Sequence, residues 1–168
     1  MNHVNINRFI RLFAGIAFAI YASYLIYYTF LDPSLGRSVI RQEIMHNTTG
    51  VDYVNLVPFK EINRFVSNIG NIRFNIILLN VIDNVVAFIP LGFLLPVITN
   101  RKLVWWSTIL IAAGASALIE VMQYVTKLGT CDIDDFILNT IGGILGYVFY
   151  RLLFLIIDVI YRKRQKKS

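Results

Sequence analysis

Acidic and carboxamide side chains interrupt the long apolar stretches of this chain, and their types and spacing could do chemistry. They gather near one end of each stretch: Asn80, Asp83 and Asn84 in one, Glu120 and Gln123 in the next, and Asp132, Asp134, Asp135 and Asn139 where the last begins. A carboxylate facing lipid is costly, so these side chains are expected to point into protein or a watery cavity. Carboxylates that share a partly desolvated pocket repel one another, so one of them can hold a proton, bind a cation or receive an ammonium group.

The spacing of these residues predicts that several share a helix face. Asn80, Asp83 and Asn84 stand at i, i+3 and i+4, and Glu120 and Gln123 stand at i and i+3. We therefore expect one ligand-binding cavity lined by Asn80, Asp83, Asn84, Glu120, Gln123, Asp132, Asp134, Asp135 and Asn139. Within it, Asp83 and Glu120 are the candidates for a catalytic role.

Each group also has a purely structural interpretation. A carboxylate among Asp132, Asp134 and Asp135 is suited to cap a helix, because it accepts the free amides of the first turn. Asn80 and Asn84 suit hydrogen bonds between helices as well as they suit a ligand. The three aspartates offer hard oxygen ligands, which leaves a divalent cation open, but no Gly-rich turn accompanies them. No cofactor is otherwise predicted.

The elements that must position these residues are apolar enough to cross a membrane. Of the 168 residues, 57% are hydrophobic and 15% charged, whereas soluble domains are about 45–50% apolar and about 25% charged. Four apolar stretches, at about 12–31, 76–98, 103–125 and 136–161, are long enough for a bilayer core of about 30 Å. The prediction is a single-domain, all-α membrane protein: four transmembrane helices, a long loop over 32–75 and a basic tail over 162–168.

Glycine spacing predicts one close helix contact. Gly142 and Gly146 lie four residues apart on the last stretch, on the face that also carries Asp135 and Asn139. Small residues at this spacing let a second helix approach closely within a membrane.

Basic residues predict the orientation of the chain. They concentrate before the first stretch, between the second and third, and in the tail, whereas the acids outside the stretches lie in 32–75 and 126–135. By the positive-inside rule, both termini are cytoplasmic and the polar residues lie in the outer leaflet of a plasma membrane. Because the basic residues flank apolar stretches and do not line a folded face, nucleic acid is excluded as a partner. Neither a nucleophile triad nor a phosphate-binding loop is present.

Five fragments, in their order and spacing, resemble the VanZ-like family of membrane proteins. They are Asn55–Phe59, Asn84–Phe88 with Pro90, Leu91 and Gly92, Glu120–Gln123, Asp132–Asp135 and Asn139–Gly143. The resemblance implies a bacterial plasma-membrane protein associated with resistance to teicoplanin and related lipoglycopeptides.

The resemblance brings no settled mechanism, so three hypotheses follow from composition and depth. The first is a non-enzymatic protein whose acidic cavity binds a lipoglycopeptide or a lipid-linked cell-wall precursor. The second is a membrane enzyme that modifies such a precursor, with Asp83 or Glu120 as general acid or base. The third is a structural membrane protein for envelope maintenance. Membrane lipids are expected partners in each case, and a homo-oligomer is left open.

Overall fold

Four long helices make up most of the molecule. The computed structural model describes residues 3–31, 54–67, 73–100, 103–126 and 130–165. The long helices are α1 (His3–Ile26), which continues as a π-helical segment η1 (Tyr27–Leu31), α4 (Arg73–Ile98), α5 (Trp105–Thr126) and α6 (Ile133–Gln165). Each contains a stretch long and apolar enough to cross a membrane. The predicted all-α architecture with four potential membrane spans is confirmed.

Shorter elements lie between these helices. Helix α3 (Lys60–Ser67) and strand β1 (Val54–Asn55) precede α4, and strand β2 (Cys131–Asp132) leads into α6. The predicted loop 32–75 thus contains folded parts, while its residues 32–53 and 68–72 lie outside the described residues. Residues 162–165 of the predicted tail continue α6, and 166–168 lie outside the described part.

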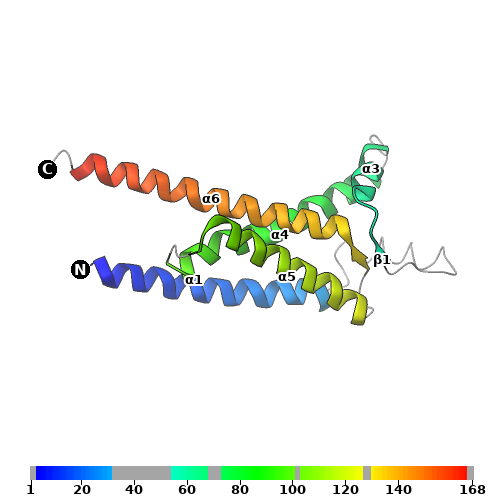
Figure 1. Cartoon of the computed structure of the whole chain (residues 1–168), viewed down its shortest axis with the longest axis horizontal. Helices are drawn as coiled ribbons and strands as arrows, with labels where there is room; N and C mark the ends of the chain where they lie inside the picture. Colours follow the sequence, from blue (N-terminus) through cyan, green and yellow to red (C-terminus); the bar gives the residue numbers. More distant parts are fainter. Residues whose placement is uncertain (1–2, 32–53, 68–72, 101–102, 127–129, 166–168) are drawn as a thin grey trace.

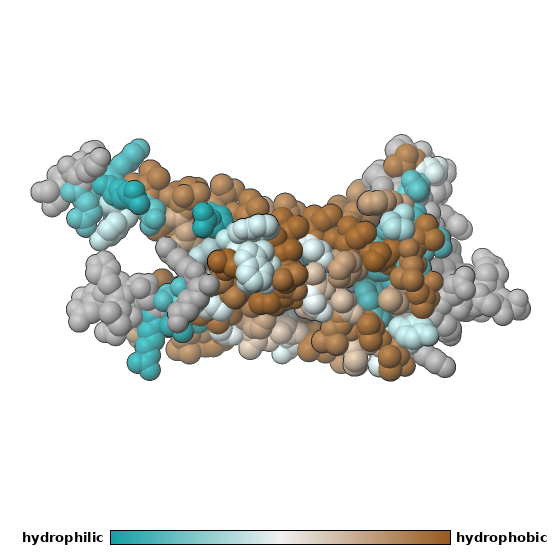
Figure 2. All heavy atoms as spheres, viewed as in Figure 1, coloured by the Kyte–Doolittle hydropathy of each residue, from teal (hydrophilic) through white to brown (hydrophobic). Residues whose placement is uncertain are grey.

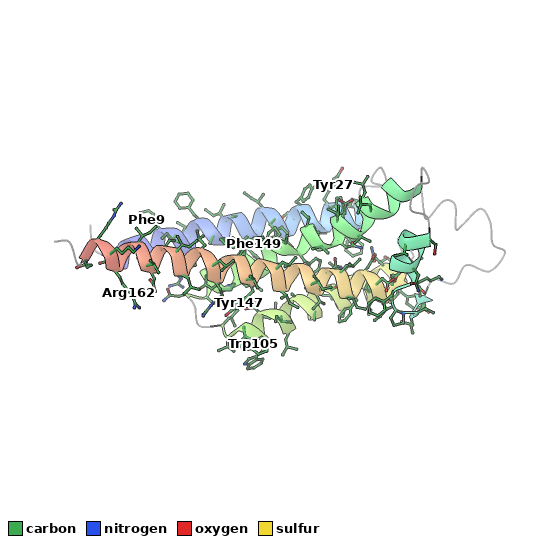
Figure 3. All side chains as sticks on the ribbon, turned by 90° about the horizontal axis from the view of Figure 1, so that it is seen from above. Phe9, Tyr27, Trp105, Tyr147, Phe149 and Arg162 are labelled. Carbon is green, nitrogen blue, oxygen red and sulfur yellow. The ribbon has the colours of Figure 1, made fainter. Side chains whose placement is uncertain are left out.

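The two chain termini lie at the same end of the bundle (Figure 1). We call it the termini end, and we call the opposite end, where α5 finishes and α6 begins, the cluster end. On the face shown in Figure 2, the middle of the bundle is mostly hydrophobic, and hydrophilic residues gather toward both ends. Figure 3 places Phe9 and Arg162 near the termini end and Tyr27 near the cluster end. An apolar waist between polar ends is the surface expected of a bundle that spans a bilayer.

Glycines bring α4 and α6 into close contact. A Cβ atom on Gly142 would lie 2.1 Å from the carbonyl oxygen of Val85, and one on Gly146 would lie 2.0 Å from that of Ile89. No other pair of described helices makes a contact as extensive as α4 with α6. The close approach predicted from these glycines is therefore confirmed, and its partner is α4.

A small apolar core joins three of the helices. Phe88 and Leu91 of α4 and Ala112 of α5 are buried, and Phe18 and Leu25 of α1 pack against them. Most other large apolar side chains are exposed on the bundle surface. In a bilayer these side chains contact lipid, so burial of apolar surface within the protein cannot by itself hold the helices together. Close packing between helices and polar contacts therefore contribute more to the stability of the bundle.

Candidate functional site

The start of α6 is fixed by its preceding aspartate. The Asp132 side chain accepts a hydrogen bond at Oδ1 from the backbone N–H of Asp134, 2.9 Å away, which is the geometry of a helix N-cap. The capping role predicted for one of the three aspartates therefore belongs to Asp132. This cap also explains why α6 begins at Ile133, three residues before the predicted position.

Glu120 of α5 holds the same residue from a second side. Its Oε2 accepts a hydrogen bond of 2.8 Å from the backbone N–H of Asp132. Glu120 is only 4% exposed, and a buried carboxylate needs such a partner to offset its lost hydration. The contact joins the cluster end of α5 to the residue that starts α6.

The segment before α3 closes over these aspartates. Strand β1 pairs in parallel with β2, so that Asn55 lies opposite Asp132 and donates from Nδ2 to its Oδ2, 3.0 Å away. The backbone N–H of Phe59 donates to Oδ1 of Asp134. Phe59 has a φ of 63°, a left-handed conformation that is unusual for a bulky residue, and this hydrogen bond helps to hold it.

Two carboxamides extend the contacts into the bundle. Asn84 of α4 donates from Nδ2 to Oδ1 of Asp135, and Asn139 of α6 donates from Nδ2 to the Ser116 hydroxyl of α5, 3.0 Å away. Together these residues form what we call the polar cluster: Asn55, Asn84, Ser116, Glu120, Asp132, Asp134, Asp135 and Asn139. The cluster connects β1, α4, α5 and α6.

Sequence reasoning missed three members of this arrangement. Asn55 and Phe59 are the first and last residues of one fragment that carries the family resemblance. Nothing in the sequence pairs them with the aspartates. Ser116 stands four residues before Glu120, so helical spacing would have placed it on the same face.

Several polar atoms in this region are buried without a partner. The side chains of Asn84, Gln123 and Asn139 are at most 3% exposed. Among the residues that the structure describes, the Oδ1 atoms of the two asparagines and both amide atoms of Gln123 have no hydrogen-bond partner. Gln123, although a predicted site residue, thus lies inside the bundle without joining the polar cluster.

The aspartates do not form a metal site within the described ranges. There, no group of three His, Cys, Asp or Glu side chains is arranged to hold a metal ion. Asp132 and Asp134 instead accept hydrogen bonds from Asn55 and from backbone amides. The divalent cation left open by the sequence gains no support from this geometry, and no chemical step is derived through it.

The single cysteine lies beside the cluster. Burial raises the pKa of the Cys131 thiol, and the negative charges of Glu120 and Asp132 raise it further. A raised pKa keeps the thiol protonated at neutral pH, so Cys131 is a poor nucleophile.

Asp83 lies apart from the polar cluster. Its Oδ2 accepts a hydrogen bond of 3.2 Å from the Tyr28 hydroxyl of η1, whereas the adjacent Asn84 reaches Asp135 of α6. Consecutive side chains on a helix point about 100° apart, so neighbouring residues of α4 contact different helices. The structure therefore does not bring Asp83 and Glu120 into one hydrogen-bonded group. The side chain of Asn80, on α4, lies outside the described part of the chain.

Asp83 instead lines a pocket between the first helix and α4. We call it the aromatic pocket. Its lining residues are Tyr21, Tyr24, Leu25, Tyr28, Asp83, Val86, Ala87 and Pro90, and its volume is about 270 Å³. The Tyr21 hydroxyl donates to the carbonyl of Ala87, 2.8 Å away, beside the proline that interrupts the helical N–H pattern.

These features define a class of protein: a multi-pass helical membrane protein with a buried polar cluster at one end and a pocket between two of its helices. The chain belongs to the VanZ/LLP1 family, whose model matches residues 18–155.

A comparison with curated proteins supports the same assignment. The chain is 34% identical over 99 residues to Protein VanZ of Enterococcus faecium. The aligned region covers 59% of this chain and 53% of that protein. The chain therefore matches about half the length of this relative. No solved structure matches significantly. The resemblance found in the sequence fragments is confirmed at the level of the family.

Proposed function

We propose that this protein is a non-enzymatic binding protein that lowers the susceptibility of a bacterium to teicoplanin and related lipoglycopeptides. Its ligand would be the acylated drug or a lipid-linked cell-wall precursor, bound at the cluster end of the bundle. The observation that carries the proposal is a pocket between two apolar helices that is lined by the carboxylate of Asp83.

The depth of the pocket suits an acylated ligand. Tyr28 stands three residues before the end of the apolar stretch predicted over 12–31, and Asp83 stands seven residues after the start of the stretch predicted over 76–98. At about 1.5 Å per residue, Tyr28 would lie roughly 5 Å and Asp83 roughly 10 Å inside the apolar layer. A ligand held by its acyl chain presents its polar part at this level.

The polar cluster favours binding over catalysis. The carboxylates of Glu120, Asp132 and Asp134 each accept a hydrogen bond from a backbone N–H, and these bonds fix the start of α6 and the β1 segment. These three carboxylates therefore hold backbone segments in place. None of these three carboxylates is among the residues that line the aromatic pocket.

The proposed orientation places the cluster end outside the cell. Both termini, with the basic residues near them, would then be cytoplasmic, as the positive-inside rule requires. The drug and the peptide ends of cell-wall precursors are met on the outer side, so the pocket would face the compartment that holds either ligand.

The test compares Asp83→Asn with Asp158→Asn in cells that lack other resistance factors. Asp158 is an exposed carboxylate of α6 outside the pocket, so its replacement is a matched control. We expect Asp83→Asn to restore drug sensitivity and change the amount of labelled lipoglycopeptide retained at the membrane, at unchanged protein abundance. The control should behave like the parent protein.

Two results would contradict the proposal. An Asp83→Asn variant with undiminished protection would exclude the pocket as the binding site. A covalently altered cell-wall precursor, found by mass spectrometry only in cells that carry the protein, would identify an enzyme in place of a binding protein.

A further inference from the structure

We infer that the aromatic pocket binds the ammonium group of an amphiphile. This inference rests on the proposed binding function and gives its ligand a chemical class. Three observations point to it: a carboxylate with a single polar partner among the described residues, a row of tyrosines and an opening along the lipid-facing surface.

The carboxylate supplies the charge complementarity. Within the described residues, the one polar partner of Asp83 is the Tyr28 hydroxyl. None of the residues that line the pocket is Lys, Arg or His. A carboxylate can accept several hydrogen bonds, and at the edge of a bilayer it is stabilised by a cation. Because no described residue of the pocket supplies that cation, a ligand that carries one would complete the site.

The tyrosines add a second preference for a cation. Tyr21, Tyr24 and Tyr28 stand three and four residues apart and line the same pocket. The rings of Tyr24 and Tyr28 are stacked, with centroids 6.0 Å apart. A cation within about 6 Å of an aromatic ring is attracted to its face. An ammonium group satisfies both the rings and the carboxylate, whereas a neutral or anionic head group does not.

The remaining lining accommodates an alkyl chain. Leu25, Val86 and Pro90 are apolar, and Tyr24 and Val86 are 61% and 53% exposed, so the pocket is open toward the surface that faces lipid. Its volume of about 270 Å³ lies at the lower limit for small-molecule pockets. It suits a head group of a few heavy atoms whose chain lies in the bilayer, not a whole glycopeptide.

The experiment measures binding of dodecylamine and of dodecanol to the purified full-length protein in phosphatidylglycerol nanodiscs. The two probes share one alkyl chain and differ in charge. We expect the amine to bind more tightly than the alcohol. Asp83→Asn removes the charge partner of the ammonium group. It should weaken amine binding about tenfold, which corresponds to about 1.4 kcal/mol, and leave alcohol binding unaffected.

Ring removal gives a second, independent variant. Tyr24→Leu should weaken amine binding about twofold to fivefold, the range of a cation–π contact at an exposed site. Asp158→Asn and Tyr124→Leu replace an exposed carboxylate and an exposed tyrosine outside the pocket, and they should bind like the parent. Equal affinity of the parent for both probes, or full amine affinity in folded Asp83→Asn or Tyr24→Leu, would overturn the inference.

Competition separates the two sources of the ammonium group. Displacement of dodecylamine by phosphatidylethanolamine in the nanodisc identifies bulk lipid, whereas displacement only by a lysine-containing lipid-linked precursor identifies the precursor. Comparison with the drug response separates the two proposals. Amine binding that needs Asp83 alongside a drug response that does not would refute the proposed function, and the reverse pattern would refute the ammonium inference.

Discussion

Asp83 and Asn84 are adjacent in the chain, yet they act in different parts of the molecule. Asp83 meets Tyr28 at the aromatic pocket, whereas Asn84 is fully buried and bonds to Asp135. Because successive side chains on a helix diverge by about 100°, α4 can line the aromatic pocket with one residue and join the internal polar cluster with the next.

Two buried amides should respond in opposite ways to apolar replacement. Asn84→Leu removes the hydrogen bond to Asp135 and should lower the free energy of unfolding by about 1–3 kcal/mol. Gln123→Met keeps the side-chain length but removes an amide that has no partner among the described residues, so stability should be unchanged or higher. Thermal unfolding in detergent measures both. A large loss for Gln123→Met would mean that its amide is partnered in the membrane.

The Cys131 thiol should show an alkaline reactivity profile. Its pKa is raised by burial and by the negative charges of Glu120 and Asp132, so the reactive thiolate forms only at higher pH than in a free cysteine. Iodoacetamide should therefore react slowly at neutral pH, with a rate that rises into the alkaline range. Glu120→Gln removes one negative neighbour and should shift this profile to lower pH.

The control for that experiment is Asp158→Asn, which removes a carboxylate remote from Cys131 along α6 and should leave the profile unchanged. A fast reaction at neutral pH in the parent protein would contradict the raised pKa of the thiol.

At the scale of elements, the bundle depends on the glycine contact between α4 and α6. Gly146→Ala would place a methyl group 2.0 Å from the carbonyl oxygen of Ile89, a backbone atom that cannot move without the helix. We expect the two helices to separate and the protein to lose several kcal/mol of stability, beyond the about 1–3 kcal/mol typical of overpacking.

Gly114→Ala is the matched control on α5. A Cβ there would meet nothing within 4 Å, so the better helix propensity of alanine should leave stability unchanged or raise it by up to about 1 kcal/mol. Thermal unfolding and the yield of monodisperse protein in detergent compare the two variants. Equal stability of both would show that close packing at Gly146 does not limit the bundle.

The sequence predicts the long elements well and the short ones poorly. Four apolar stretches specify the helices because length and hydropathy decide membrane spans directly. The pairing of Val54 with Cys131 and of Asn55 with Asp132 involves two residues per strand, which carry no periodic pattern. Their contact joins segments far apart in the chain, and a single sequence holds no record of it.

The same limit applies to the candidate site. Helical spacing correctly places Glu120 and Gln123 inside the bundle, but spacing cannot tell which neighbouring helix a side chain meets. The position of Asp83 against Tyr28 depends on how α1 packs on α4, which the sequence pattern does not determine. The aromatic pocket was therefore outside the reach of sequence reasoning, although each of its tyrosines is visible in the sequence.

At the scale of the whole molecule, the two ends differ in charge. Arg8 and Arg11 of α1 and the basic residues at the end of α6 lie at the termini end, where Arg11 also donates to the carbonyl of Ile98 at the end of α4. The cluster end holds Glu120 and the aspartates, together with Lys60 at the start of α3. A membrane that retains positive charge on its cytoplasmic side would orient the bundle by this difference.

Single cysteines test that orientation in a Cys131→Ala background. Val57 is 61% exposed between β1 and α3 at the cluster end, and Lys163 is exposed near the end of α6 at the termini end. With a membrane-impermeant maleimide on intact cells, we expect Val57→Cys to be labelled at once and Lys163→Cys only after permeabilisation. Labelling in the opposite pattern would place the aromatic pocket on the cytoplasmic side, where it could not meet a drug arriving from outside, and the proposed function would fail even if the pocket binds ammonium.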